Sequence, residues 1–516
     1  MSKPHGMKRI SPLRVLVAWF LGVVLTTVVH AASGPVPPSV TKPKNVVFVI
    51  VDDLRPKLGC YGDPVAISPN IDSLAKESTL FTRAYDQYPV CGPSRASFLS
   101  GLRPDSTGIY GNDIEPSKAL ANTLVINRYF AKIGFEVAGF GKVYHDGDGP
   151  KEAAWTRPFV QSKWLDYVRP ENRAIGDLWF TPKHKKGERI PSSWEAEDLP
   201  DDSYGDGMVA REAVKTLKEF AGQKKPFMMI VGFRHPHLPW CAPKKYWDLY
   251  DRSKLPTATN RDFPKDAPEV SLNRFGELWS YANTPQGVPL TEELQKQAVH
   301  GYYACMSYAD AQVGKIIAEL KELRLYDDTV IVLVSDNGYQ MGDNGTWCKE
   351  VNWEATNHIV LLLRAPGNGK PGQVVDHLVE LVDVYPTLCA ASGVPIPAHC
   401  EGGSLLPLMD DPKTPWTDVV FNQFKRGNVM GRSLRTERYR FTLWEDEGGK
   451  LAGRELYDQQ EDPQGNVNLA DHPEQNGRVE ELTMLLREKW PKSHLAAETA
   501  DTIKKAHEAK DAPPKE

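Results

Sequence analysis

The chain has 516 residues, a length that predicts two domains rather than one small core. Charged residues make up 25% and hydrophobic residues 41%, which is a globular balance, and the net charge of −5 gives no reason to expect a nucleic-acid partner. The seven cysteines are odd in number and sparse, so disulfides are not expected to be the main staple and at least one thiol should be unpaired or modified.

Residues 1–32 have the pattern of an export signal. Lysines and arginines precede the apolar run 15–29, and Val29-His30-Ala31 offers a small-residue cleavage site. A membrane anchor is the alternative, but the run is short for a span. We therefore favour cleavage, no stable membrane insertion afterwards, and a periplasmic or secreted location (lysosomal or extracellular in a eukaryote). A proline-rich linker is expected over residues 33–44.

The first strand is expected at Asn45–Val51, a continuous apolar and β-branched run of the kind that a parallel sheet buries on both faces. It ends in Asp52 and Asp53. Two adjacent carboxylates at the carboxyl end of a buried strand repel each other unless a cation lies there, and open α/β sheets place their sites at that end. A solvated turn is the commoner meaning of this dipeptide alone. A short helix is expected at Pro69–Lys76.

The stretch from Val90 to Gly101 predicts a loop that runs into a helix, with Pro93 in the first turn and the glycine as its stop. Cys91 would then lie where a helix N-terminus favours an anion. Arg95, about one turn further on, can fork onto a tetrahedral oxyanion. Three residues separate this cysteine from the arginine, whereas a tyrosine-phosphatase loop needs five. A buried cysteine at a helix start is the alternative.

Three later strands also end in residues that bind anions, move protons or bind metal. Each ending alone has an ordinary explanation, such as a surface lysine, a capping histidine or a turn, but four strands of this kind are hard to ascribe to accident. A long amphipathic helix, Leu294–Leu323, would cover one face of the sheet. The strands and their endings are Glu136–Phe140 before Gly141–His145, Phe227–Phe233 before Arg234–His237, and Thr329–Ser335 before Asp336-Asn337-Gly338.

These motifs, in this order, resemble the type I, formylglycine-dependent sulfatases, and within that family the iduronate-2-sulfatase type. The string C-x-P-S-R at Cys91–Arg95 is the sulfatase signature. The similarity runs from Asn45 to about residue 410 and returns in the C-terminal part. Its other motifs are Val51–Arg55, Leu58–Gly62, Ser68–Asp72, Gly141–His145, Pro236-His237, Trp347-Cys348-Lys349 after Asp336-Asn337-Gly338, Leu456–Asp458, Asp462-Pro463 and Asn468–Ala470.

The chain departs from the iduronate-type pattern at three points. Asn337 stands where those enzymes usually carry histidine, although an amide oxygen also offers a neutral ligand that suits calcium. Gly92 replaces alanine at a position of the signature that the family leaves free. One cysteine of the family's late disulfide is missing, which leaves Cys400 unpaired. None of the three changes removes a catalytic group, and the exact sugar stays open.

The resemblance implies an alkaline-phosphatase-like α/β fold. A catalytic sulfatase domain over residues 45–410 would contain a large mixed sheet flanked by helices. A smaller C-terminal subdomain over residues 416–495 would carry an antiparallel sheet and a helix, and Pro407–Pro415 is the expected linker. In this part the sequence predicts strands at Ser433–Trp444 and Glu455–Tyr457, a helix at Glu474–Lys489, and a disordered tail over residues 496–516.

The resemblance also implies a metal and a modified nucleophile. One hard divalent ion, calcium, would be held by Asp52, Asp53, Cys91, Asp336 and Asn337. A formylglycine-generating enzyme would convert Cys91 to formylglycine, whose gem-diol attacks sulfur and forms a sulfo-enzyme intermediate. The other catalytic residues would be Arg95, Lys142, His145, His237 and Lys349.

These residues have separate expected roles. Arg95, Lys142 and Lys349 offset the negative charge of the carboxylates and the sulfate. His237 protonates the departing sugar oxygen, and His145 helps to remove the proton from the second hydroxyl. Substrate contacts are assigned to Lys142, His237, Trp347 and Lys349. The tryptophan would either give a flat face to a sugar ring or merely pack its loop.

The expected substrate is a sulfated carbohydrate such as a glycosaminoglycan, from which 2-O-sulfate is removed at a terminal uronic acid. Another sulfated polysaccharide is an alternative. A phosphatase or phosphodiesterase of the same superfamily would need serine or threonine as nucleophile and usually two zinc ions with histidine ligands. A glycan-binding protein that lost the chemistry is disfavoured by the intact Cys91, Arg95, His145 and His237.

Overall fold

The structure is a computed structural model that describes residues 44–145, 149, 154–161, 166–179, 190–273 and 276–491. The predicted export signal, the linker up to residue 43 and the predicted tail lie outside the described residues, so they stay predictions. Within the described residues, no helix is long and apolar enough to cross a bilayer. All seven cysteines are described and none is in a disulfide.

A seven-stranded mixed sheet carries the site, in the order β11-β2-β10-β7-β1-β5-β3. The strands are parallel except β10, which is antiparallel to both of its neighbours. Three central strands have the predicted bounds, and their continuous apolar runs are buried along almost their whole length. The bounds are β1 Asn45–Val51, β2 Thr79–Tyr85, β3 Glu136–Gly141, β5 Phe227–Phe233, β7 Thr329–Ser335, β10 His358–Arg364 and β11 Gln373–Glu380.

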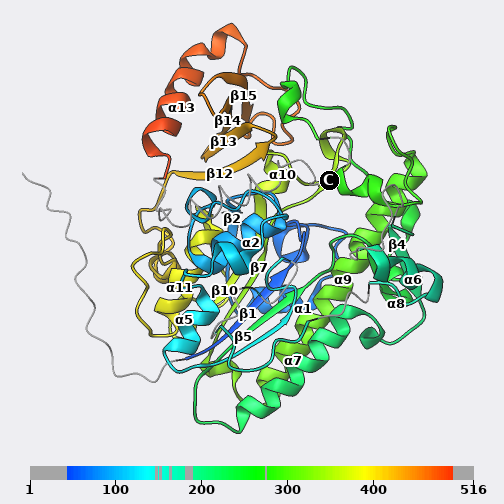
Figure 1. Ribbon diagram of the computed structural model, residues 1–516, viewed down its shortest axis with the longest axis vertical. Helices are drawn as coiled ribbons and strands as arrows, with labels where there is room; N and C mark the ends of the chain where they lie inside the picture. The colour runs from blue at the N-terminus through cyan, green and yellow to red at the C-terminus, as the bar shows by residue number, and fades with distance from the viewer. Residues whose placement is uncertain are drawn as a thin grey trace, which may run out of the picture. The chain divides into compact units, whose positions relative to one another are not determined.

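Helices cover both faces of this sheet (Figure 1). Alternate residues of β1 point to opposite faces, so Val47 lies in one apolar core and Phe48 in the other. The long helix α9 begins two residues before the predicted start, where Thr291 caps it by accepting a hydrogen bond from the Leu294 amide. One face holds α1 Pro69–Ala75, α7 Gly205–Ala221 and α9 Glu292–Glu322, and the other holds α2 Cys91–Ser100, α5 Ile126–Lys132 and α11 Val384–Ala391.

A four-stranded antiparallel sheet and helix α13, Asn476–Lys489, form the C-terminal part (Figure 1). The predicted strand Ser433–Trp444 was wrong in one respect: it spans two strands of a hairpin, with the turn at residues 437–438. That turn has no glycine, proline or asparagine to signal it. The strands are β12 Val419–Arg426, β13 Val429–Thr436, β14 Tyr439–Asp446 and β15 Leu451–Asp458.

The expected linker Pro407–Pro415 differs from the structure, because its first half belongs to helix α12, Leu406–Asp410. Leu408 and Met409 are buried in the same core as α11, so apolar packing fixes this segment. The remaining elements are short. They are α3 Pro104–Thr107, α4 Pro116–Ala119, α6 Pro170–Trp179, α8 Lys244–Trp247, α10 Glu354–Asn357, β4 Trp194–Glu197, β6 Trp240–Pro243, β8 Gln340–Met341 and β9 Trp347–Cys348.

Candidate active site

The candidate site lies where β1, β5 and β7 end, because their parallel register brings their carboxyl ends to one edge of the sheet. Helix α2 begins at this edge with Cys91, and Gly101 ends it in the left-handed region, with φ 73°. The predicted loop-to-helix arrangement is therefore confirmed. The first N–H groups of α2 are not all free, because the Gly92 amide donates to Asn112 Oδ1 at 2.9 Å and the Ser94 amide donates to the Val90 carbonyl at 3.0 Å.

Three buried carboxylates meet at the strand ends. Asp52, Asp53 and Asp336 are fully buried, and one oxygen of each lies within 4.8 Å of the others. The Asp53 amide donates to Asp336 Oδ1 at 3.1 Å. Asp53 has a positive φ of 58°, and the Tyr302 hydroxyl of α9 donates to its carbonyl at 2.8 Å. The sheet and α9 together thus hold an unfavourable backbone conformation that brings the carboxylates close.

Each carboxylate has a cationic partner. Lys142 pairs with Asp52, and Lys349 Nζ donates to both oxygens of Asp53 at 2.6 and 2.7 Å. Arg95 donates through Nε to Asp336 Oδ2 at 2.8 Å and through Nη2 to Asp52 Oδ1 at 3.1 Å. Three cations therefore face three carboxylates, and their charges balance.

The expectation that Arg95 forks onto a bound oxyanion is not met in this structure. Its side chain is fully buried, and Nη1 donates to the carbonyls of Lys142 and Val143 while its other nitrogens hold the two carboxylates. Arg95 therefore orients the acidic cluster and the strand end that carries Lys142, rather than presenting its fork to open space.

The electrostatic environment separates the three carboxyl groups. Burial raises the pKa of Asp336 to about 7, although Arg95 opposes that change. Burial also raises the pKa of Asp53, against the effect of Lys349. Burial acts in the same direction on Asp52, but Lys142, His237 and Arg95 outweigh it and hold the pKa of Asp52 well below its usual range. A cluster of this kind favours an added cation, which would lower all three pKa values.

Asn337 gives the sharpest sign that a cation fits here. Its Nδ2 donates to Asp53 Oδ1 at 2.7 Å and to the Gly338 carbonyl at 2.8 Å. Its Oδ1 is buried and has no hydrogen-bond partner among the described residues. Because an unpaired buried acceptor is costly, this oxygen beside three carboxylates matches the oxygen-rich ligand set that calcium prefers.

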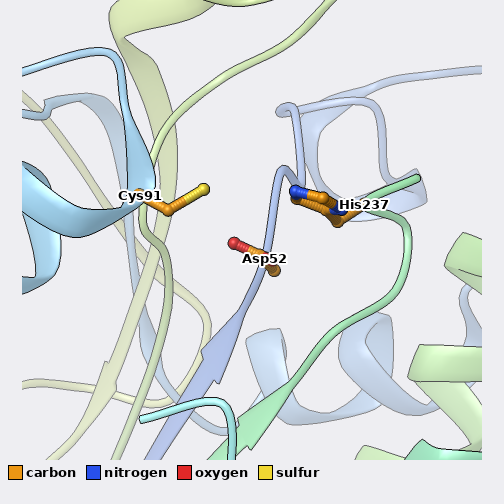
Figure 2. A group of neighbouring side chains, drawn as sticks. All are labelled: Asp52, Cys91 and His237. Atoms are coloured by element: carbon orange, nitrogen blue, oxygen red, sulfur yellow. The ribbon is translucent and has the colours of Figure 1, made fainter. Parts of the chain in front are cut away.

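Cys91 faces this cluster. Figure 2 shows Cys91, Asp52 and His237 reaching one shared space from three separate segments. The thiol lies 3.2 Å from Lys349 Nζ and 3.9 Å from Asp53 Oδ1. Burial and Asp52 raise the pKa of this thiol well above its usual range, so the unmodified cysteine is a weak nucleophile here.

His237 closes the cluster on the side opposite α2. Its Nδ1 bonds to the Leu238 carbonyl, which directs Nε2 to 4.0 Å from Asp53 Oδ2. Burial, Lys349 and Lys142 lower its pKa well below the usual value. His145 follows the β3 end and is half-buried at the limit of the described loop.

Two glycines let the Lys142 backbone reach this position. A Cβ at Gly232 would come within 1.8 Å of the Lys142 carbonyl oxygen, and a Cβ at Gly141 within 2.1 Å of the Gly232 oxygen. Gly141 also has φ 69°. The ends of β3 and β5 can approach this closely only without side chains, and the turn then directs the lysine at Asp52.

Trp347 does not offer the flat sugar-binding face that the sequence suggested. Only 2% of it is exposed, and its ring packs edge-on against Trp240 at 6.3 Å. The other expectation, that it anchors the loop leading to Lys349, agrees with this packing.

Sequence reasoning missed two residues. Glu277 lies 3.5 Å from His237 Nε2 and 4.0 Å from Lys349 Nζ, in the short helical turn Gly276–Ser280, which no sequence pattern revealed. Asp206 at the start of α7 accepts from the amides of Arg234 and His235 at 2.9 Å each, and contacts His235 Nδ1 at 2.8 Å. Asp206 thereby fixes the turn that leads to His237.

Comparison with known proteins agrees with this geometry. The family described as Sulfatase matches residues 44–394, and the family described as N-sulphoglucosamine sulphohydrolase, C-terminal, matches residues 342–492. The chain belongs to the sulfatase family. This sulfatase is 30% identical to the iduronate 2-sulfatase of Homo sapiens over 500 residues, which cover 82% of this chain and 89% of that protein. A sulfatase from Formosa agariphila is 30% identical over 483 residues, 90% of each chain.

The fold prediction is also confirmed. A phosphonate monoester hydrolase from Silicibacter pomeroyi superposes with a TM-score of 0.69 at 23% identity, covering 88% of this chain and 97% of that chain. The fold is therefore that of the sulfatases and alkaline-phosphatase-like hydrolases, and the enzyme is a sulfuric ester hydrolase.

Proposed function

We propose that this sulfatase removes a 2-O-sulfate from a terminal uronic acid of a sulfated glycan, with a formylglycine at position 91. The observation that carries the mechanistic part is the buried acidic cluster beside Cys91, with the unpaired Oδ1 of Asn337. The relationship to iduronate 2-sulfatase at 30% identity supports the sugar and the sulfate position.

The metal would be one calcium ion held by Asp52, Asp53, Asp336, Asn337 and residue 91. When bound, it supplies positive charge that polarises an oxygen of the sulfate and of the nucleophile. The three cations already balance the three carboxylates, so a divalent ion leaves the site positive for an anionic substrate.

Residue 91 would be the nucleophile after oxidation of the thiol to formylglycine by a generating enzyme. Hydration of the aldehyde gives two hydroxyls, one to attack sulfur and one to release sulfate and restore the aldehyde. Lys349 Nζ, 3.2 Å from the residue-91 sulfur, can hold either hydroxyl in place.

The remaining residues would bind charge and move protons. Lys142 and Lys349 face the sulfate, while Arg95 holds the carboxylates in position. His237 would give its Nε2 proton to the leaving sugar oxygen. An anion bound between the two lysines offsets the charge that lowers the pKa of His237, so substrate binding favours the protonated ring. His145 would take the proton from the second hydroxyl.

Two measurements test this proposal. Peptide mass spectrometry of active protein from its native host should show formylglycine at residue 91, and an intact thiol in active protein would refute the modification. A panel of sulfated saccharides should show the fastest turnover for 2-sulfated uronates. Faster turnover of 6-O-sulfated hexosamine or of neutral galactose sulfates would reject the uronate and leave the sulfatase assignment in place.

A phosphatase or phosphodiesterase is the second candidate, since a phosphonate monoester hydrolase shares the fold. Elemental analysis separates the two, because about one calcium per chain is expected here and two zinc ions for the alternative. We also propose export, on the basic and apolar pattern of residues 1–32, followed by action on extracellular or periplasmic glycans.

A further inference from the structure

Glu277 differs from every other carboxylate of the site in its exposure. Its side chain is 30% exposed, whereas those of Asp52, Asp53 and Asp336 are fully buried. It comes from the short helical turn Gly276–Ser280, outside the strand ends that build the metal cluster. Glu277 is therefore the carboxylate through which this cluster meets solvent, and a bound substrate would come next to it.

Glu277 lies nearest to His237, the residue proposed to protonate the leaving group, and next to Lys349. Its Oε1 lies 3.5 Å from Nε2 of His237, the atom proposed to protonate the departing sugar oxygen. Its Oε2 lies 4.0 Å from Nζ of Lys349. A group on the carbon next to the ester would thus lie beside Glu277 when the ester oxygen lies at His237.

No described residue uses the hydrogen-bond acceptor capacity of Glu277. Neither of its contacts is shorter than 3.5 Å, and no described residue donates a hydrogen bond to it. A carboxylate beside an anion-binding lysine also weakens the binding of a sulfate, by like-charge repulsion of about 1 kcal/mol or more at such distances. Glu277 therefore disfavours anion binding unless the substrate donates a hydrogen bond to it. A sugar hydroxyl is such a donor, and its hydrogen bond to a carboxylate is strong.

We propose that Glu277 is a specificity-determining residue that accepts a hydrogen bond from the sugar hydroxyl adjacent to the sulfate-bearing carbon. The assignment rests on the proposed carbohydrate sulfatase function and deepens it. It selects sugars with a free hydroxyl next to the sulfate, and it disfavours a second sulfate or a carboxylate at that carbon because two anions would then meet.

The test compares two substrates in three proteins. The substrates are a sulfated monosaccharide and its analogue that lacks the adjacent hydroxyl. The proteins are the wild type, Glu277→Ala, and the matched control Glu322→Gln at the far end of α9, where the side chain is exposed. The wild type should prefer the hydroxylated sugar by about ten- to a hundredfold in kcat/KM, since charge-assisted hydrogen bonds carry discrimination of that size. That preference should fall to near one in Glu277→Ala and persist in Glu322→Gln.

The outcomes are separable. An equal loss on both sugars, with a shifted pH profile, would mean that Glu277 acts only by positioning His237, and would overturn the assignment. Loss of one equivalent of bound metal in Glu277→Gln would make it a metal ligand and also overturn it. Absence of hydrolysis of every sulfate ester by the wild type, with formylglycine verified by mass, would overturn the proposed function together with this inference. Retained hydrolysis with an unchanged preference in Glu277→Ala would overturn this inference alone.

Discussion

Two buried clusters of charge invite comparison: the acidic cluster at the edge of the large sheet, and the group around Glu354 at the junction with the C-terminal sheet. Glu354 is a single carboxylate. Its Oε1 accepts from the Tyr85 hydroxyl at 2.7 Å, and its Oε2 accepts from Arg440 at 2.8 Å and Arg435 at 3.2 Å. Burial raises its pKa, but the two arginines outweigh burial and hold that pKa far below its usual range.

The edge cluster also pairs carboxylates with cationic side chains, but its carboxylates lie close to one another. Three carboxylates crowd together, the pKa of Asp336 is raised to about 7, and Asn337 Oδ1 has no partner. The comparison shows that buried charge alone does not mark a functional site. In the edge cluster like charges are in contact and one acceptor has no hydrogen-bond partner among the described residues, whereas both oxygens of Glu354 accept hydrogen bonds.

The largest expected effect comes from breaking the edge cluster. Asp336→Ala should lower kcat/KM for a sulfate ester by at least about a thousandfold, because it removes a proposed metal ligand and a partner of Arg95. The fold should survive, since one crowded carboxylate is lost. Sulfate release, circular dichroism and metal content measure the three consequences. Activity within tenfold of the wild type would contradict the assignment.

Breaking the group around Glu354 should instead lower the stability of the fold. Glu354→Ala leaves Arg440 and Arg435 without their carboxylate and should lower the free energy of unfolding by about 3–5 kcal/mol. Denaturant unfolding measures it. The control is Glu447→Ala, whose side chain is 78% exposed and pairs with Lys425 at 3.4 Å, and which should change stability by less than about 1 kcal/mol. Equal losses in the two variants would erase the distinction between the clusters.

Asn337 allows the comparison to be tested at a single atom, its side-chain Oδ1. Asn337→Ala should weaken calcium binding by about ten- to a hundredfold, as expected when one ligand contact is lost. Calcium should raise the Tm of the wild type more than that of the variant, because the ion binds only the folded state. Differential scanning calorimetry with calcium and with chelator measures both. A calcium-induced Tm shift that is identical in the two proteins would exclude the amide as a ligand.

The smallest effect is expected at Asp201, a carboxylate held by two lysines. It forms an ion pair with Lys245 at 2.6 Å and accepts a hydrogen bond from Lys315 at 2.7 Å, and these contacts outweigh burial and lower its pKa to about 2. The stabilisation is fully present above the unfolded pKa near 4 and is lost as the pH falls through about 2. Asp201→Asn should thus cost about 1–2 kcal/mol at pH 7 and nothing near pH 1.5. A cost independent of pH would exclude the ionic origin.

The sequence predicted those features that local pattern determines. The central strands β1, β5 and β7 have the predicted bounds because their continuous apolar runs can only be buried, and α2 begins at Cys91 as its proline and glycine indicate. The hairpin of β13 and β14 was missed because packing, not turn residues, reverses the chain at residues 437–438.

The tertiary contacts of the site lay beyond the sequence pattern. The burial of Trp347 against Trp240 joins residues more than a hundred positions apart, so an exposed sugar platform and a packed anchor looked alike. Arg95 looked like an anion-binding fork because its carboxylate partners come from β1 and β7. Glu277 was missed because only the fold brings its irregular segment to His237.

The contact of Gly232 with the Lys142 carbonyl restricts how this lineage can diversify. Both Gly141 and Gly232 lie where a methyl group would enter the neighbouring strand end, so a single-step replacement there displaces the ammonium from Asp52. Substitutions at Gly141 and Gly232 are therefore expected to impair the enzyme, although neither glycine has a side chain that could contact a substrate. A mutational library aimed at new substrates should leave these codons untouched and vary the partly exposed residues of the turn 276–280 instead, where new side chains can be explored without moving Lys142.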